Sequence, residues 1–216
     1  MKQIVLTLAC LSTCTLYTAH SPLVKTVLQE QTEPKTLAAS QEQIIYDGTS
    51  VLPNNSWENL PNALYFYDST RPYFDLSNFD TRHPFEINGV TWASSEHYFQ
   101  AQKFVDEPEI YALIQNAARP RDALKLAREY KAKERKDWFQ ENQEAMYTAL
   151  RAKFTQHPEL TKLLLATDDQ ILVEDAGKND AYWGAGADMK GTNFLGRMLM
   201  YIRKELQDEI QKNVIS

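Results

Sequence analysis

The chain has 216 residues, of which 43% are hydrophobic and 11% aromatic, enough for one sizeable hydrophobic core. Its net charge of −6 and isoelectric point near 5.3 argue against general binding of DNA or RNA through the phosphate backbone. The two cysteines, Cys10 and Cys14, both lie near the N-terminus, so the folded part is expected to contain neither a disulfide framework nor a thiolate metal site.

The N-terminal segment looks like a short secretory signal. Lys2 is followed by a largely apolar run from Ile4 to Ala19, which is too short to span a bilayer comfortably. A clean small-residue cleavage pattern is missing around Ala19, so a mis-assigned start or a hydrophobic tail is the alternative. We predict a signal-like leader over residues 1–20, which favours export, and a disordered polar linker over residues 21–60. The folded domain is expected over residues 61–212.

The first half of this domain is predicted to mix short strands with helices. A strand is expected at Leu64–Tyr67, and a hairpin at Phe85–Trp92, because Asn88-Gly89 supplies the positive φ angles of a two-residue turn. A helix is expected over residues 95–105, where Ser94 or Ser95 can cap a first-turn amide. The next two helices are expected to begin at prolines, which the first helical position tolerates, and to cover residues 108–116 and 120–130.

The second half is predicted to be mainly helical. A long helix is expected over residues 136–155, a short helix over 158–166, a strand over 171–174, a loop over 175–192 and a final helix over 193–211. Their spacing predicts buried faces made of Phe139, Met146, Leu150 and Phe154 on the long helix and of Leu195, Leu199, Ile202 and Leu206 on the last. This order predicts an α+β fold, a mostly helical single domain with a small antiparallel sheet.

One polar stripe on the helix at 95–105 is a candidate site. Glu96, Gln100 and Lys103 stand at i, i+4 and i+7, so they share one face of the helix. Aromatic residues surround them in the sequence, and a carboxylate, an amide and an amine in such a setting can hold and act on a polar substrate. A solvated surface stripe explains the same pattern.

The loop that contains Asp180, Tyr182 and Trp183 is the second candidate. A loop this long inside a compact domain usually has a function or is disordered, and its aromatic residues argue against disorder. Trp183 could stack on a flat ring while the Asp180 carboxylate acts on the attached group. Alternatively, Tyr182 and Trp183 simply anchor the loop to the core.

Other kinds of site find little support in the sequence. His83, His97 and His157 form no ligand set of metal-binding spacing, so we predict no metal and expect these side chains to be hydrogen-bonded or exposed. No dinucleotide fingerprint and no serine-nucleophile elbow is present, and no cofactor is predicted. Gly191-Thr192, just before the last helix, could hold an anion on free helix amides.

Four blocks of sequence resemble the YbiA-like N-glycosidases, also called the NADAR family. The blocks follow the family's order and spacing over about residues 64–208. They are Leu76-Ser77-Asn78-Phe79; Thr91-Trp92 with Ser95-Glu96-His97-Tyr98-Phe99-Gln100-Ala101-Gln102-Lys103-Phe104; Ala149-Leu150-Arg151-Ala152-Lys153-Phe154 with His157; and Asn179-Asp180-Ala181-Tyr182-Trp183-Gly184 with Gly191-Thr192-Asn193, Leu195 and Gly196. The leader departs from the family's bacterial members, whose location would be cytoplasmic.

The resemblance implies an enzyme that hydrolyses the C–N bond between ribose 5-phosphate and an amino-pyrimidine of riboflavin biosynthesis. It places the functional trio at Glu96, Asp180 and Trp183, and a further pocket tryptophan at Trp138. Glu96 is expected to be the main acid/base, Asp180 to position the ribose or a water, and Trp183 to stack on the base. Lys103 is expected to be a Schiff-base nucleophile or a phosphate contact. The predicted substrate-binding set is completed by Asn78, Gln100, Tyr182 and Gly184.

Two alternative functions follow from the same resemblance. The first is a hydrolase directed at ADP-ribose, which would remove it from guanine or act on NAD-derived substrates. The second is a non-catalytic module that binds ADP-ribose or a nucleotide. In each case the partner is a small molecule, with no general nucleic-acid binding and no membrane span in the folded domain. Arg71, Lys153 and Lys190 are candidate phosphate contacts or ordinary surface charges.

Overall fold

The computed structural model describes residues 56–177 and 180–215. The predicted leader (1–20) and most of the predicted linker (21–55) lie outside the described residues. The α+β class is confirmed, because helices dominate and the short strands form two separate two-stranded sheets. No helix in the described part of the chain is both long enough and apolar enough to cross a membrane.

The predicted hairpin is confirmed as the small antiparallel sheet. Strands β2 (Phe85–Ile87) and β3 (Val90–Trp92) pair so that Phe85 lies opposite Trp92. The turn between them holds Asn88 at φ 53° and Gly89 at φ 77°, the left-handed angles that a two-residue hairpin turn requires. Phe85 and Trp92 are both buried, so the hairpin attaches to the core at its open end.

A parallel strand pair forms the second sheet. Strand β1 (Ala63–Phe66) runs beside β4 (Ile171–Glu174), with Phe66 opposite Glu174. Both strands were predicted, but their pairing was not, since nothing in either segment identifies a partner that far away in the chain. The pairing fixes the C-terminal end of β4, where Glu174 and the following loop begin.

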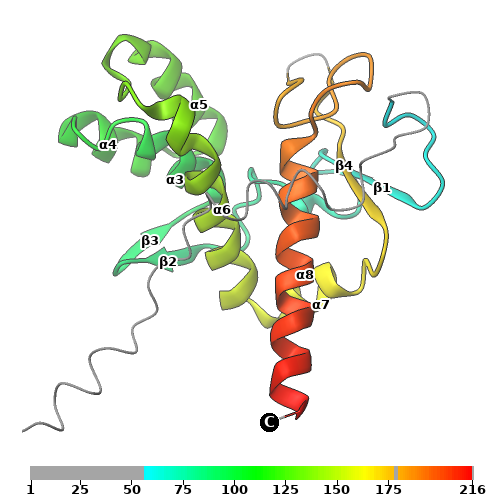
Figure 1. Cartoon of the computed structure of the whole chain (residues 1–216). Helices are drawn as coiled ribbons and strands as arrows, with labels where there is room; N and C mark the ends of the chain where they lie inside the picture. The colour runs from blue at the N-terminus through cyan, green and yellow to red at the C-terminus, as the bar shows by residue number, and fades with distance from the viewer. Residues whose placement is uncertain (1–55, 178–179, 216) are drawn as a thin grey trace, which may run out of the picture. The chain divides into compact units, whose positions relative to one another are not determined.

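One long helix packs against a group of three shorter helices (Figure 1). Helices α3 (Ser95–Gln102), α4 (Pro108–Gln115) and α5 (Pro120–Glu129) pack together on one side of α6 (Trp138–Gln156), and α7 (Pro158–Leu165) follows it. Two short 3-10 turns, η2 (Phe74–Leu76) and η3 (Lys131–Lys133), lie in the connections. Ser94 caps α3 by accepting a hydrogen bond from the His97 amide, as predicted, and prolines open α4, α5 and α7.

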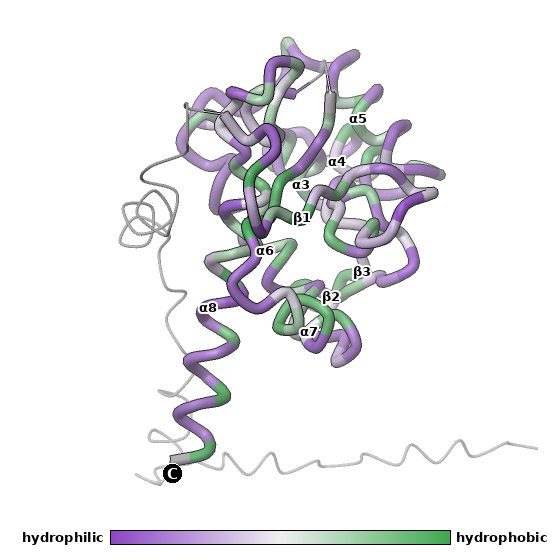
Figure 2. Tube along the Cα trace, turned by 90° about the vertical axis from the view of Figure 1, so that its right-hand side faces the viewer, coloured by the Kyte–Doolittle hydropathy of each residue, from purple (hydrophilic) through white to green (hydrophobic). Residues whose placement is uncertain are grey.

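The last helix, α8 (Phe194–Ile215), packs against β4 and α7. Hydrophobic and hydrophilic residues alternate along it, as Figure 2 shows. Its inward positions are those predicted, and all of them are buried: Leu195, Leu199, Ile202 and Leu206. The helix begins where the loop between β4 and α8, called the late loop below, ends, so its first turn supports that loop.

One predicted core residue of α6 is exposed. Met146, Leu150 and Phe154 are buried as predicted, but Phe139 is 82% exposed. Phe139 has the helical spacing of a core position, yet it lies at the border of an open cavity in the first turn of α6. The periodicity was correct, but a position with core spacing can face a cavity instead of a packed neighbour.

The folded part also begins earlier than residue 61. Trp57 is fully buried, its indole Nε1 donates to the carbonyl of Gly191 at 2.7 Å, and its amide donates to Met189 at 2.8 Å. The Arg197 guanidinium lies 5.3 Å from the centre of the indole ring. Residues 56–60 therefore pack onto the late loop and do not belong to a disordered linker.

Candidate active site

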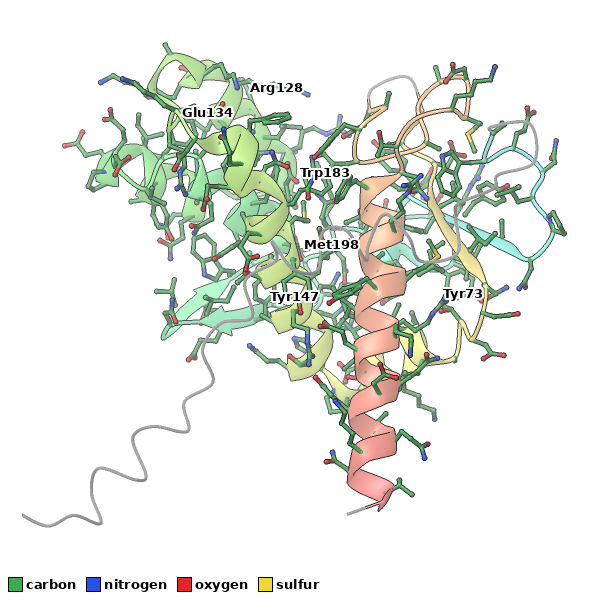
Figure 3. The ribbon with its side chains drawn as sticks, viewed as in Figure 1. Tyr73, Arg128, Glu134, Tyr147, Trp183 and Met198 are labelled. Atoms are coloured by element: carbon green, nitrogen blue, oxygen red, sulfur yellow. The ribbon has the colours of Figure 1, made fainter. Side chains whose placement is uncertain are left out.

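A cavity of about 520 Å³ opens between the α3–α5–α6 group and the loop after β4. Figure 3 labels Arg128 on the α5 side of this cavity and Trp183 on the late-loop side. Eight of the nine predicted site residues line it, and they come from segments far apart in the sequence: Asn78, Glu96, Gln100, Lys103, Trp138, Asp180, Tyr182 and Trp183. The polar stripe of α3 and the late loop thus face the same space.

Glu96 and Gln100 do not form a solvated stripe, because each is only 3% exposed. The Glu96 amide donates to the carbonyl of Asn78 at 2.9 Å, which ties α3 to the turn that carries Asn78. The Glu96 carboxylate accepts hydrogen bonds from the side-chain amides of Asn78 and Gln100, the latter at 2.7 Å. Two amides therefore fix the orientation of this buried carboxyl group.

Burial raises the pKa of Glu96 to about 7, because desolvation disfavours the charged carboxylate. Hydrogen bonds from Gln100 and Asn78 oppose that shift by stabilising the carboxylate. The charge of Lys103 also opposes it, whereas the charge of Asp180 raises the pKa further. Near neutral pH the group is populated in both its acid and its base form, as acid–base catalysis requires.

The late loop presents Asp180 and Trp183 through its own hydrogen bonds. Asp180 Oδ1 accepts from the amides of Tyr182 at 3.0 Å and Trp183 at 2.7 Å. The Trp183 ring makes edge-to-face contacts with the rings of Phe99 and Phe194, at distances of 5.2 Å and 5.7 Å between ring centres. These contacts fix its plane beside α3. Tyr182 adds a link to α6, since its hydroxyl accepts a hydrogen bond from Gln143 at 2.9 Å. Asn179, part of the same motif, lies outside the described residues.

The amides at the start of α8 are already engaged. Asn193, Phe194 and Leu195 donate to loop carbonyls at 3.0–3.1 Å, those of Gly184, Tyr182 and Trp183 respectively. The suggested anion site on free helix amides after Gly191-Thr192 is therefore not available. These bonds hold the loop against the helix instead.

Lys103 lies in an aromatic slot at the end of α3. Its ammonium is 5.4 Å from the ring centres of both Phe99 and Trp138, and 3.9 Å from a carboxylate oxygen of Glu134. Burial lowers the pKa of Lys103, although the charges of Glu134 and Glu96 oppose the change. A larger fraction of neutral amine makes the side chain more nucleophilic, and the charged form can still attract a phosphate.

Glu174 is a cavity residue that the sequence analysis did not identify. It closes β4, is 5% exposed and lines the cavity with Asp180 and Glu96. Burial, and then the charges of Asp180 and Glu96, raise its pKa to about 8. The available signal was an acidic residue that ends the apolar run Ile171–Val173 just before the loop of Asp180.

Lys153 is neither a phosphate contact nor a surface charge. It is fully buried, donates to the carbonyls of Asp75 at 2.6 Å and Ser77 at 3.0 Å, and pairs with Asp80 at 3.3 Å. Burial lowers its pKa to about 8 despite the attraction of Asp80. Lys153 therefore holds the turn from which Asn78 reaches Glu96.

A group of possible metal ligands lies outside this cavity. Asp75, Asp80 and His83 offer ligand atoms within 4.8 Å of one another. Asp80 is already paired with Lys153 and receives hydrogen bonds from Arg82 and, at 2.6 Å, from the His83 ring. Burial would raise the pKa of Asp80, but these partners outweigh it and lower the pKa to about 2. The cluster is accounted for as an ion-pair network.

The remaining candidates lie away from the cavity lining. Gly184 is buried beneath the loop, where a Cβ atom would lie 3.0 Å from the carbonyl oxygens of Glu174 and Asp180, so it allows tight packing of the loop and does not line the cavity. Arg71 and Lys190 are exposed and outside the cavity. His97 is buried and bonded to Ser94 and Ala117, as expected for a structural histidine.

Comparison with known proteins places this geometry in a family. The family model of the NADAR domain matches residues 65–207. The chain belongs to the NADAR family. The NMR structure of Escherichia coli YbiA superposes with a TM-score of 0.64 at 43% identity, covering 70% of this chain and 89% of that one. The predicted NADAR fold is thereby confirmed.

Curated relatives of this NADAR chain carry enzyme names. The N-glycosidase YbiA of Escherichia coli (strain K12) is 46% identical over 144 residues, which cover 67% of this chain and 88% of the relative. The N-glycosidase Npun_R5314 of Nostoc punctiforme is 40% identical over 148 residues, or 68% and 94%. The riboflavin biosynthesis protein VVA0006 of Vibrio vulnificus is 41% identical over 158 residues, but these cover only 42% of it.

Proposed function

We propose that this NADAR protein is a hydrolase that cleaves the C–N bond between ribose 5-phosphate and an amino-pyrimidine. The names of its N-glycosidase relatives support the bond type, and the name of the Vibrio relative supports a compound of riboflavin biosynthesis. One structural observation carries the proposal. The buried acid Glu96 lines the same cavity as Asp180 and Trp183.

Glu96 acts as the acid and then as the base. In its protonated form it donates a proton to the departing nitrogen, which keeps the electron pair of the broken C–N bond. Positive charge develops on the anomeric carbon of the ribose and is stabilised by the Asp180 carboxylate. A water attacks that carbon and gives its proton to the Glu96 carboxylate, which yields ribose 5-phosphate and the free amino-pyrimidine.

The aromatic residues hold the base while this bond breaks. Trp183 is fixed by its edge contacts with Phe99 and Phe194, so one face can stack on a flat ring without reorganisation. Trp138 lines the cavity from α6, and Gln100 and Asn78 keep the Glu96 carboxyl in place. The cavity is large enough for a ribosylated base, in the usual range of small-molecule sites.

Lys103 has two candidate roles that an experiment can separate. As a nucleophile, its neutral amine attacks the C1 imine carbon of the ring-opened ribosylamine, the pyrimidine amine leaves with a proton, and water hydrolyses the Schiff base that remains between Lys103 and the sugar. As a phosphate contact, it stays charged between its aromatic neighbours. Borohydride reduction during turnover leaves a sugar adduct on the Lys103 peptide in the first case only, detected by mass spectrometry.

The test is a hydrolysis assay on the full chain with a ribosylaminopyrimidine 5′-phosphate, in which free ribose 5-phosphate is measured. Glu96→Gln is expected to lower kcat by about 10²–10⁴-fold, the usual contribution of a general acid/base, without changing the circular dichroism spectrum. Glu109→Gln, an exposed change on α4, is the control and should keep wild-type turnover. Near-normal kcat in folded Glu96→Gln would remove Glu96 from the mechanism.

A second set of incubations addresses the alternatives. Release of ADP-ribose from ADP-ribosylated guanine nucleotides, with the ribosylaminopyrimidine left intact, would replace the proposed substrate by an ADP-ribose compound. Binding of these compounds without release of any product would replace the hydrolase by a binding module.

A further inference from the structure

Glu174 is a buried carboxyl group to which the proposed reaction assigns no role. Its backbone is fixed on both sides, because its amide donates to Asn193 Oδ1 at 2.9 Å and its carbonyl accepts from the Ala185 amide at 2.8 Å. The side chain therefore leaves the end of β4 in a fixed direction, toward the cavity it lines. The backbone of Glu174 is thus fixed beside the cavity.

One oxygen of this carboxyl group lacks a partner. Glu174 Oε2 is buried and has no hydrogen bond to any residue in the described part of the chain. Leaving a buried polar group unsatisfied costs about 1–3 kcal/mol of folding free energy. An unpartnered oxygen of this kind therefore needs an explanation, and binding of a ligand is one. Because Glu174 lines a ligand-sized cavity, a ligand with a matching polar group that enters this cavity can hydrogen-bond the carboxyl group.

The surroundings of Glu174 determine what that polar group can be. With Asp180 and Glu96 nearby, this end of the cavity repels anions and favours the protonated carboxylic acid. A carboxylic acid donates one hydrogen bond and accepts others, as does a hydroxyl group. A neutral hydroxyl of the substrate is therefore a better match than a phosphate.

Basic residues gather on another side of the cavity, where Glu134 pairs with Lys103 and with Lys131. Lys103, Arg128 and Lys131 line this side from the end of α3, from α5 and from η3. This arrangement gives the cavity an acidic side and a basic side, so a sugar phosphate has one favourable orientation. Its phosphate lies toward the basic residues and its hydroxyl groups lie toward Glu174.

We propose that Glu174 is a substrate-binding residue that hydrogen-bonds the 2-hydroxyl of the ribose and so orients the sugar beneath Glu96. The 2-hydroxyl is the hydroxyl nearest to the anomeric carbon, where Glu96 acts. Glu174 lies near enough to Glu96 for the two carboxyl groups to interact electrostatically. Hydrogen bonds to this hydroxyl strengthen in the transition state of glycoside cleavage. The inference rests on the proposed function, because it takes a ribosyl phosphate as the ligand.

Binding of two product-like probes tests this contact. Ribose 5-phosphate and 2-deoxyribose 5-phosphate are titrated calorimetrically into the wild-type full chain and into Glu174→Ala, Glu174→Gln and Arg128→Ala. Wild type is expected to prefer the 2-hydroxyl sugar by about 2- to 10-fold, the value of one hydrogen bond. Glu174→Ala should bind both sugars equally, whereas Glu174→Gln, which can still donate and accept, should regain part of the preference. Arg128→Ala should weaken both sugars equally and keep the preference.

The controls separate this contact from a folding defect and from the proposed reaction. Glu129→Ala, an exposed change at the end of α5, should match wild type, and each variant's thermal unfolding is recorded. Folded Glu174→Ala that keeps the wild-type preference, or a wild type that binds neither sugar or both equally, overturns the inference. Failure of the wild type to hydrolyse any ribosylamine, with the preference and its loss intact, overturns the proposed function alone.

Discussion

The buried pair of Lys153 and Asp80 gives the sharpest prediction about stability. Lys153→Met keeps the length of the side chain but removes its charge and its three donors. Both groups are charged at neutral pH, since the pKa of Lys153 is about 8 and that of Asp80 about 2. The change therefore leaves a fully buried carboxylate without its buried cation.

The expected loss follows from what remains around the site. Removing one partner of a buried ion pair costs about 3–5 kcal/mol, and the carbonyls of Asp75 and Ser77 lose their donor as well. Arg82 and His83 still bind Asp80 and limit the damage. We expect a decrease of about 3–5 kcal/mol in the free energy of unfolding, a large share of the roughly 5–15 kcal/mol of a typical domain.

Urea unfolding at pH 7 measures this loss, provided that the slope with denaturant stays constant. Lys162→Met, an exposed change on α7, is the matched control and should lie within about 0.5 kcal/mol of wild type. The pH dependence adds a second check. The low pKa of Asp80 contributes stability above pH 3.8 that is lost as the pH falls toward 2, so Lys153→Met should unfold at a higher pH in acid. A loss below about 1 kcal/mol would refute the reasoning.

Three further predictions concern the cavity. Gln100→Leu removes a hydrogen bond that lowers the pKa of Glu96, so the inflection near pH 7 in the profile of kcat/KM should move to higher pH; an unchanged inflection would contradict this. Trp183→Ala should raise KM by about 10- to 100-fold through lost stacking, and Trp183→Phe by less; equal KM values for the two variants and wild type would exclude stacking. Because the pKa values of Glu96 and Glu174 are raised, the folded state holds protons that the unfolded state has released, so the free energy of unfolding should fall between pH 4.5 and about 8. Chemical denaturation across this range should show a smaller fall in the free energy of unfolding for Glu174→Gln than for wild type. An identical dependence of this free energy on pH in the two proteins would rule out a raised pKa of Glu174.

Local patterns in the sequence predicted most of the secondary structure. The Asn88-Gly89 turn, the prolines that open helices and the inward face of α8 depend on neighbours within a few residues, so they can be read from a single segment. The pairing of β1 with β4 depends on two segments over a hundred residues apart, as the pairing of Phe66 with Glu174 shows. No periodicity within either strand specifies that partner.

The site shows the same division. Glu96 and Gln100 were identified as sharing a helix face, but the spacing could not decide whether that face meets water or a cavity, because the segments that cover it come from elsewhere in the chain. Lys153 and Glu174 were missed as buried groups for the same reason. A charged residue in a sequence is expected at the surface. Only the fold shows that Asp80 neutralises Lys153 and that a cavity borders Glu174.

The indole of Trp57 has a practical consequence for where this domain can be cut. The family match begins at residue 65, downstream of Trp57. A domain boundary taken from that match would remove the indole ring that packs against the late loop at Met189 and Gly191. A chain that starts at residue 65 would leave the carbonyl groups of Met189 and Gly191 without the donors that Trp57 now provides. Anyone trimming this protein for expression should keep the segment from residue 56 onward.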